Sequence, residues 1–156
     1  MPALAGRLRA AGHLRKGSVM SSPVTTRLTA HLIVGLDACL DFTLTASYDG
    51  HDPYAVRLGF PSRGPHADPG PSWTFGRQLI ADGLHEATGD GDVHIWPCGF
   101  DLVMVELRSN AGSALIAVPA RGLRTFLFMS YAEVPPGYES RHLQIDTLLH
   151  DLMGRA

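Results

Sequence analysis

The stretch Ser72–Pro97, SWTFGRQLIADGLHEATGDGDVHIWP, decides the fold because it joins a strand, a helix, a turn and a second strand in one short unit. Trp73 and Phe75 occur at the two-residue period of a half-buried strand. Residues 77–82 are mostly good helix formers, and Gly83 is expected to end this helix in the left-handed conformation. The first half of the stretch therefore predicts a strand followed directly by a short helix.

The second half of the stretch predicts a tight turn and another strand. Residues 88–92, TGDGD, are rich in turn formers, and Gly91, like Gly83, is expected to be an obligatory bend. Apolar and polar or aromatic side chains then alternate until Pro97 ends the strand. We expect Trp73 and Trp96 to be packing anchors, and the whole stretch to join two antiparallel layers.

The composition fits one ordinary globular domain, with 156 residues of which 45% are hydrophobic and 18% charged. Every apolar run is interrupted far short of the roughly 20 residues that cross a bilayer, so no transmembrane segment is expected. Cys39 and Cys98 are the only cysteines and have no C-x-x-C spacing. In the absence of a recognisable secretion signal, this pattern indicates two reduced thiols in a cytoplasmic protein.

The charge distribution disfavours a nucleic-acid partner. Five of the 13 basic residues precede Leu28, whereas all 15 acidic residues follow it. The chain from Leu28 onward therefore carries 8 basic against 15 acidic residues, a net charge of −7. Proteins that bind nucleic acid need a basic surface that faces phosphate, which this part of the chain lacks.

The N-terminal residues 1–23 have a poor apolar pattern and are interpreted as a flexible arm. An alternative is that translation begins at Met20 and the preceding residues are a wrongly assigned start. A third hypothesis treats the basic residues as a tether to an acidic partner or membrane face. The domain itself is expected to span residues 24–156.

Regular patterns in the remaining chain predict an α+β domain. Three strands on short loops, over about 24–34, 40–46 and 54–60, indicate an antiparallel meander, and Pro61–Pro71 is interpreted as a loose surface loop. Residues 102–107 and 114–118 indicate a buried hairpin, with Pro119 suited to the first turn of a helix over 120–132. A last helix follows Asp146, its expected N-cap. The predicted order is ββββ-α-βββ-α-α, in two antiparallel β-layers with helices.

The search for a catalytic or metal site yields no candidate, so we predict no enzyme, no cofactor and no metal ligand. Eight histidines show no metal-binding helical spacing such as H-E-x-x-H, and no nucleotide or hydrolase motif is present. His94 beside Trp96 is interpreted as ring packing. The groups Asp49–Asp52 and Asp90–Asp92 are interpreted as turn formers rather than as acid/base or calcium sites.

The helix over 120–132 is apolar beyond the single face that a core requires. Its core stripe consists of Leu123, Phe126, Leu127 and Ser130. Phe128, Met129 and Tyr131 lie around the other side, which indicates either full burial or an exposed contact patch. These three residues are the candidate interaction surface.

Six segments of the chain carry a recognisable pattern in one collinear order: DPYAV (52–56), residues 73–84, GDGDVHIWP (89–97), PARGLRTFL (119–127), VPPG (134–137) and RHLQID (141–146). Together they resemble the SsgA-like (SsgA/SsgB) sporulation and cell-division proteins of actinobacteria. The resemblance covers roughly Val24–Met153 and depends on the order of its motifs rather than on any single one.

This resemblance implies a non-enzymatic cytoplasmic protein that acts in septum formation and is recruited to division septa. It implies cell-division partners, either the tubulin-like protein FtsZ or SsgA-like paralogues, and homo-oligomers, with trimers seen in the family. It also implies a fold similar to the Whirly single-stranded nucleic-acid binders. A Whirly-like nucleic-acid-binding protein is the alternative function, which the acidic charge balance opposes.

Overall fold

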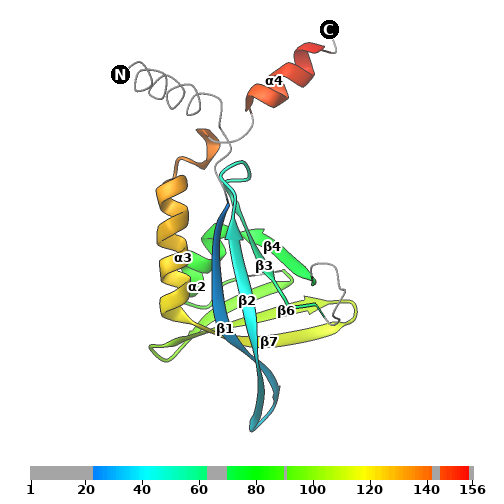
Figure 1. Cartoon of the computed structure of the whole chain (residues 1–156), viewed down its shortest axis with the longest axis vertical. Helices are drawn as coiled ribbons and strands as arrows, with labels where there is room; N and C mark the ends of the chain where they lie inside the picture. Colours follow the sequence, from blue (N-terminus) through cyan, green and yellow to red (C-terminus); the bar gives the residue numbers. More distant parts are fainter. Residues whose placement is uncertain (1–22, 63–69, 90, 142–144, 155–156) are drawn as a thin grey trace, which may run out of the picture.

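The two longest strands form the centre of the molecule, as their alternating patterns predict. The computed structural model describes residues 23–62, 70–89, 91–141 and 145–154, and Figure 1 shows it as a curled sheet with a long helix alongside. Strand β1 (Val24–Gly35) pairs antiparallel with β2 (Ala38–Tyr48), from Val24 opposite Tyr48 to Gly35 opposite Ala38. Leu28 therefore faces Leu44, and alternate apolar residues of both strands share one face.

All seven described strands belong to one antiparallel sheet. The others are β3 (Ala55–Gly59), β4 (Ser72–Gly76), β5 (Val93–Cys98), β6 (Leu102–Ser109) and β7 (Gly112–Pro119). Their order across the sheet is β4-β3-β2-β1-β7-β6-β5. The prediction of two separate layers is therefore wrong. β1 also pairs with β7, at His31–Ala117 and Leu32–Ile116, and this short ladder joins the meander to the second group of strands.

The helices in the described part of the chain are α2 (Arg77–Gly83), α3 (Ala120–Glu133), the short 3-10 helix η1 (Glu139–Arg141) and α4 (Ile145–Gly154). Helices α2, α3 and α4 occur in the predicted order, and η1 was not predicted. Two boundary predictions need correction. Pro119 is the N-cap of α3 rather than a residue of its first turn, and Asp146 is the second residue of α4 rather than its N-cap.

The core lies between one face of the sheet and helices α2 and α3. Residues Leu123, Phe126, Leu127 and Ser130 of α3 are buried, as predicted. Gly122 lets α3 approach β1 closely, because a Cβ there would lie 2.3 Å from the Leu28 side chain. The largest fully buried side chains are Tyr48, Phe126, Leu44, Leu58, Ile80, Ile95, Ile116 and Leu123.

The stretch Ser72–Pro97 connects the two opposite edges of the sheet, β4 and β5, through α2. Gly83 does not take the predicted left-handed conformation. It is required instead because a Cβ would lie 2.2 Å from Ile95 Cγ2 on β5. Gly91 lies in a bend, as predicted, but glycine is not required there, since Gly89 takes the positive φ (109°) in this loop and a Cβ on Gly91 would meet no atom within 4 Å.

The two tryptophans have different surroundings. Trp73 is half-buried and packs against the core. Trp96 lies on the opposite face of β5 from the fully buried Ile95, beside His94 and Glu106, so it is not an anchor of this core. The alternation of β5 is the reason, because successive side chains point to opposite faces of a strand.

Candidate interaction surfaces

The core face of β1 and β2 continues beyond α3 into an apolar groove. The groove has a volume of about 780 Å³ and lies between the β1–β2 hairpin, residues 60–62 and 71 next to β3 and β4, and the β6–β7 turn. Phe42 and Phe60 stack in it with ring centroids 5.6 Å apart. Its described apolar lining includes Leu32, Leu40, Phe42, Phe60, Trp73 and Leu107.

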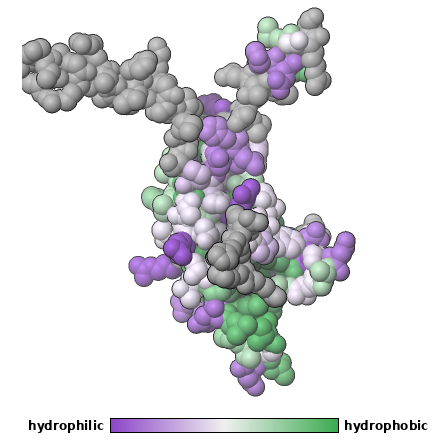
Figure 2. Space-filling view, turned by 45° about the vertical axis from the view of Figure 1, so that its right-hand side comes forward, coloured by the Kyte–Doolittle hydropathy of each residue, from purple (hydrophilic) through white to green (hydrophobic). Residues whose placement is uncertain are grey.

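The exposed hairpin extends the apolar character of the groove. Leu40 is 58% exposed, Val34 is 52% exposed and Leu36 at the turn is fully exposed. Figure 2 shows hydrophobic residues gathered over the lower part of the molecule, where Figure 1 places the β1–β2 hairpin. We call the groove and the hairpin residues Val34, Leu36 and Leu40 the open-end surface. Monomeric proteins rarely leave a contiguous apolar area of this kind in water.

The three residues of the interaction surface that the sequence predicts on α3 differ in their exposure. Phe128 is 74% exposed and Met129 is 41% exposed, so both are available for contact. Tyr131 is half-buried and lies under the Arg77 guanidinium, 4.9 Å from Arg77 Cζ to the ring centroid. Tyr131 thus belongs to the packing between α2 and α3, and the predicted set of three does not form one exposed patch.

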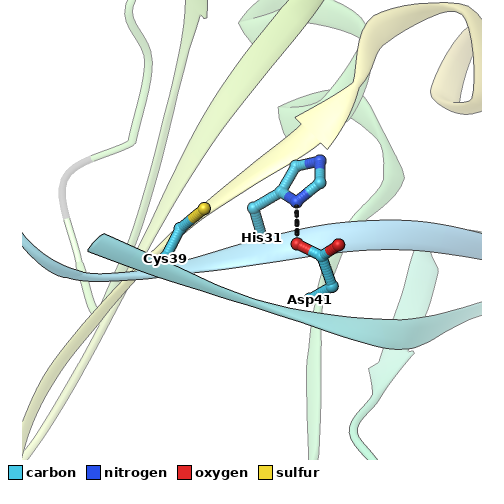
Figure 3. Close-up of side chains that lie close together, drawn as sticks. All are labelled: His31, Cys39 and Asp41. Carbon is cyan, nitrogen blue, oxygen red and sulfur yellow. Dashed lines mark hydrogen bonds and ion pairs between the residues drawn. The ribbon is translucent and has the colours of Figure 1, made fainter. Parts of the chain in front are cut away.

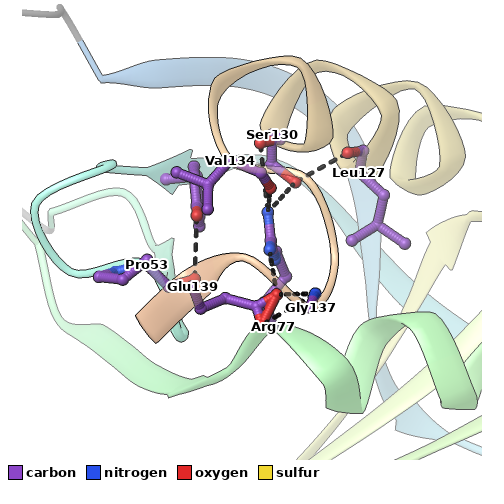
Figure 4. A network of polar contacts seen from close by, with 8 residues as sticks. Pro53, Arg77, Leu127, Ser130, Val134, Gly137 and Glu139 are labelled. Atoms are coloured by element: carbon purple, nitrogen blue, oxygen red, sulfur yellow. Dashed lines mark hydrogen bonds and ion pairs between the residues drawn. The ribbon is translucent and has the colours of Figure 1, made fainter. Parts of the chain in front are cut away.

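Arg77 is a buried centre of polar contacts that the sequence prediction missed. It is the first residue of α2, is 4% exposed, and reaches the C-terminal end of α3 (Figure 4). Its Nη1 donates to the Val134 carbonyl oxygen at 2.8 Å and to the Ser130 carbonyl oxygen at 3.2 Å. Its Nη2 donates to Glu139 Oε1 at 3.1 Å, which ties η1 to the other two helices.

The Arg77 network also includes two aromatic rings. The guanidinium lies over Tyr48 at 4.7 Å and over Tyr131 at 4.9 Å, an arrangement that favours the cation electrostatically. Burial raises the pKa of Tyr48, and the positive charge of Arg77 offsets part of that increase. One signal in the sequence pointed to this role, because Arg77 is expected at the N-terminus of a helix. A positive charge there interacts unfavourably with the helix dipole, so other groups must stabilise it.

Asp49, His51 and Asp52, which the sequence predicts to form a turn, make the hydrogen bonds that are typical of one. Asp49 accepts hydrogen bonds from the backbone and ring nitrogens of His51, each at 2.9 Å, and these bonds lower the Asp49 pKa. The Asp52 amide donates to the Asp49 carbonyl oxygen at 3.0 Å, which closes the turn. This geometry confirms the interpretation of Asp49 and Asp52 as turn formers. Asp90 lies outside the described residues.

Residues with metal-binding chemistry come together at one place in the described part of the chain, where His31, Cys39 and Asp41 meet on β1 and β2. His94 Nδ1 lies 3.7 Å from Glu106 Oε1 and is buried without a hydrogen-bond partner. Cys39 and Cys98 are free and exposed. No described helix has the length and apolar character needed to cross a membrane.

Known proteins similar to this chain are cell-division proteins. The family described as Streptomyces sporulation and cell division protein, SsgA, matches residues 42–139. The sporulation-specific cell division protein SsgB of Streptomyces coelicolor is 38% identical over 140 residues, covering 88% of this chain and all of the relative. SsgB of Frankia casuarinae is 36% identical over 135 residues, covering 85% of this chain and 92% of the relative.

Two solved structures have the same architecture. The first, from work on SsgB mutations that correlate to longitudinal cell division during sporulation of Streptomyces coelicolor, has a TM-score of 0.73 at 39% identity. It covers 81% of this chain and 100% of that chain. The second, an SsgA-like protein of Thermobifida fusca, has a TM-score of 0.72 at 33% identity and covers 85% and 98%. These relatives give no support to the nucleic-acid alternative, and the similarity to the Whirly fold stays a prediction.

Proposed function

Because the chain belongs to the SsgA family of Streptomyces sporulation and cell division proteins, we propose that it acts in septum formation by binding other proteins, without catalysis. The single observation that carries this proposal is the open-end surface. Its apolar groove continues directly from the core, and exposed Leu40 stands at its rim. A protein partner that covered this surface would remove apolar area from water, the main driving force of protein association.

The chemistry of the groove favours a protein chain over nucleic acid as its occupant. No Lys or Arg is among its described lining residues, whereas nucleic-acid binding depends on cations that neutralise phosphate. Aromatic rings at the groove, Phe42, Phe60 and Trp73, are typical of the residues that dominate protein interfaces. The lining thus supports recognition of apolar side chains from a partner.

The proposed partners are copies of this chain and components of the division machinery. We propose homo-oligomers, with a trimer as the first state to test, and recruitment from the cytoplasm to septa through FtsZ or an SsgA-like paralogue. Phe128 and Met129 form a second, smaller exposed surface on α3. The two surfaces lie on different elements, so one could hold a subunit while the other binds the division protein.

The test is a fluorescent fusion in the native sporulating host, combined with deletion of the gene. We expect fluorescence at septa and abnormal septation in the deletion strain. A Leu40→Glu fusion should lose its septal pattern, whereas Phe128→Glu is the matched exposed substitution on α3. Uniform fluorescence of the wild-type fusion together with normal septa after deletion would refute the division role. Loss of localisation only in Phe128→Glu would assign recruitment to α3 instead.

A further inference from the structure

The outer face of the β1–β2 hairpin brings together three side chains with metal-binding chemistry. His31 on β1 lies directly opposite Asp41 on β2, and Cys39 precedes Asp41 by two residues on the same strand. Because side chains alternate along a strand, Cys39 and Asp41 share one face of the sheet. One ligand atom from each of the three residues lies within 4.8 Å of the others (Figure 3).

The arrangement does not resemble a nucleophilic triad. His31 Nδ1 lies 2.6 Å from Asp41 Oδ1, and in Figure 3 the second ring nitrogen is on the far side of the imidazole from both Asp41 and Cys39. A Cys–His–Asp triad needs that second nitrogen to face the thiol, so that it can take the proton. Instead, three atoms lie close enough together to bind one ion. They are the imidazole nitrogen that faces the carboxylate, the carboxylate oxygen and the sulfur.

We propose that His31, Cys39 and Asp41 form a binding site for Zn²⁺ on the outer face of the hairpin. A neutral imidazole, a thiolate and a carboxylate are the three ligand types that Zn²⁺ accepts, and the thiolate selects against Mg²⁺ and Ca²⁺. Three protein ligands leave one position of a tetrahedral ion for water or for a group from another molecule. Asp41 also lines the open-end groove, so the site adjoins that surface, but the inference does not depend on the proposed function.

The ligands need only a small adjustment to enclose the ion. Bond lengths of about 2.0–2.3 Å place the ligand atoms of a tetrahedral Zn²⁺ roughly 3.3–3.8 Å apart. The His31–Asp41 contact of 2.6 Å must therefore open slightly, and the Cys39 sulfur already lies within 4.8 Å of the other two ligand atoms. His31 is partly exposed and Asp41 is exposed, so these side chains can rotate and an ion can reach them from solvent. Binding requires a proton-free His31 Nδ1, so the imidazole proton moves through water to the second ring nitrogen, and the thiol releases its proton to water.

The chain contains a second histidine–carboxylate pair and a second exposed thiol, which serve as matched controls for the proposed ligands. The Asp49–His51 pair has a similar histidine–carboxylate contact, at 2.9 Å, and is not part of a described metal-binding cluster. Cys98 is the other exposed free thiol. Substitutions at His51 and Cys98 therefore alter the same functional groups without altering the proposed site.

The test uses the full-length chain without an affinity tag, purified with a chelator, kept reduced with a phosphine and titrated with Co²⁺ as the spectroscopic probe. We expect a thiolate-to-cobalt charge-transfer band and tetrahedral visible bands, which Zn²⁺ then abolishes by displacement. Cys39→Ser should lose the charge-transfer band, and His31→Ala or Asp41→Asn should weaken binding about tenfold or more. Cys98→Ser and His51→Ala should retain the wild-type titration.

Two results would overturn the proposal. One is the absence of a charge-transfer band in the wild-type chain at excess Co²⁺. The other is an equal loss of the band in Cys98→Ser and Cys39→Ser, which would indicate non-specific thiol binding. Circular dichroism of each variant establishes folding, and Asp41→Asn, which preserves side-chain shape, replaces any variant that does not fold.

Discussion

The two ends of strands β1 and β2 have the same alternating pattern, but helices cover the apolar face at one end and leave it exposed at the other. At one end, Leu28 and Tyr48 are buried beneath helices. At the other end, Leu32 and Leu40 lie on the same face of the same strands and line an exposed groove. The difference arises from coverage rather than from local sequence, because α3, at 14 residues, extends along only part of the sheet. The alternating pattern of a strand determines which face is apolar, but it does not determine whether another element covers that face.

The two ends also differ in how polar groups are used. The covered end is held by the buried Arg77 network, which connects α2, the end of α3 and η1. The described lining of the open end contains Asp41 and a few serines but no comparable buried cation. The covered end is therefore expected to determine stability, and the open end to determine association.

Removing the Arg77 guanidinium should produce the largest loss of stability. Arg77→Leu leaves Glu139 and the Ser130 and Val134 carbonyl oxygens without their donor, at a cost of about 3 kcal/mol in the free energy of unfolding. Urea denaturation followed by circular dichroism measures this loss. The control is Arg108→Leu, an exposed partner of Glu106, which should change stability by less than about 0.5 kcal/mol. Equal stabilities of the two variants would contradict the assignment.

Adding a methyl group at Gly83 should cause the next largest loss of stability. A Cβ in Gly83→Ala would lie 2.2 Å from Ile95 Cγ2, and overpacking of this kind costs about 1–3 kcal/mol. Gly91→Ala is the matched control, because its Cβ meets nothing within 4 Å and its φ is not positive. If Ile95→Ala does not reduce the penalty of Gly83→Ala in a double-mutant cycle, the contact is not its cause.

The sequence predicted the order of strands and helices because local signals mark each element. Ser72–Pro97 specifies strand, helix, turn and strand through alternation and helix propensity alone. The β1–β7 pairing that makes one sheet depends on contacts distant in sequence, which no local pattern reveals. The roles of Gly83 and Gly89 likewise depend on Ile95 and Val93, which approach them only in the folded chain.

Candidate site residues were harder to predict for the same reason. Phe128 and Met129 follow from helical periodicity, and the structure exposes both. Tyr131 has the same apolar character, but its position under Arg77 depends on packing between two helices. His31, Cys39 and Asp41 come together through strand register, whereas metal-binding motifs in sequence are usually sought at helical or C-x-x-C spacing.

Ionisation of Tyr48 should weaken the covered end at alkaline pH by a smaller amount. Burial raises the Tyr48 pKa in the folded state, so folding favours the protonated phenol. The resulting stability is fully present below the unfolded pKa of about 10 and is lost as the pH rises through the folded pKa. Denaturation between about pH 8 and 11 should therefore show a steeper loss for wild type than for Tyr48→Phe.

The Tyr48→Phe variant separates this pH effect from the hydrogen bond. It removes the bond from the Tyr48 hydroxyl to the Pro53 carbonyl oxygen, 2.9 Å long, which costs about 1 kcal/mol at neutral pH. The two chains should therefore approach each other in stability as the pH rises. Parallel stability curves across the alkaline range would show that Tyr48 is not the group responsible.

A charge at the open end should leave stability almost unchanged and alter association instead. Leu40 is 58% exposed, so Leu40→Glu should change the free energy of unfolding by no more than about 0.5 kcal/mol. If this surface holds a second copy, however, the buried carboxylate would be costly, and sedimentation should show smaller species than for wild type. Phe128→Glu introduces the same charge at a residue that is 74% exposed on α3, and it should sediment like wild type. Dissociation of the α3 variant alone would assign the subunit contact to the helix, and the groove beyond α3 would then be left to the division partner.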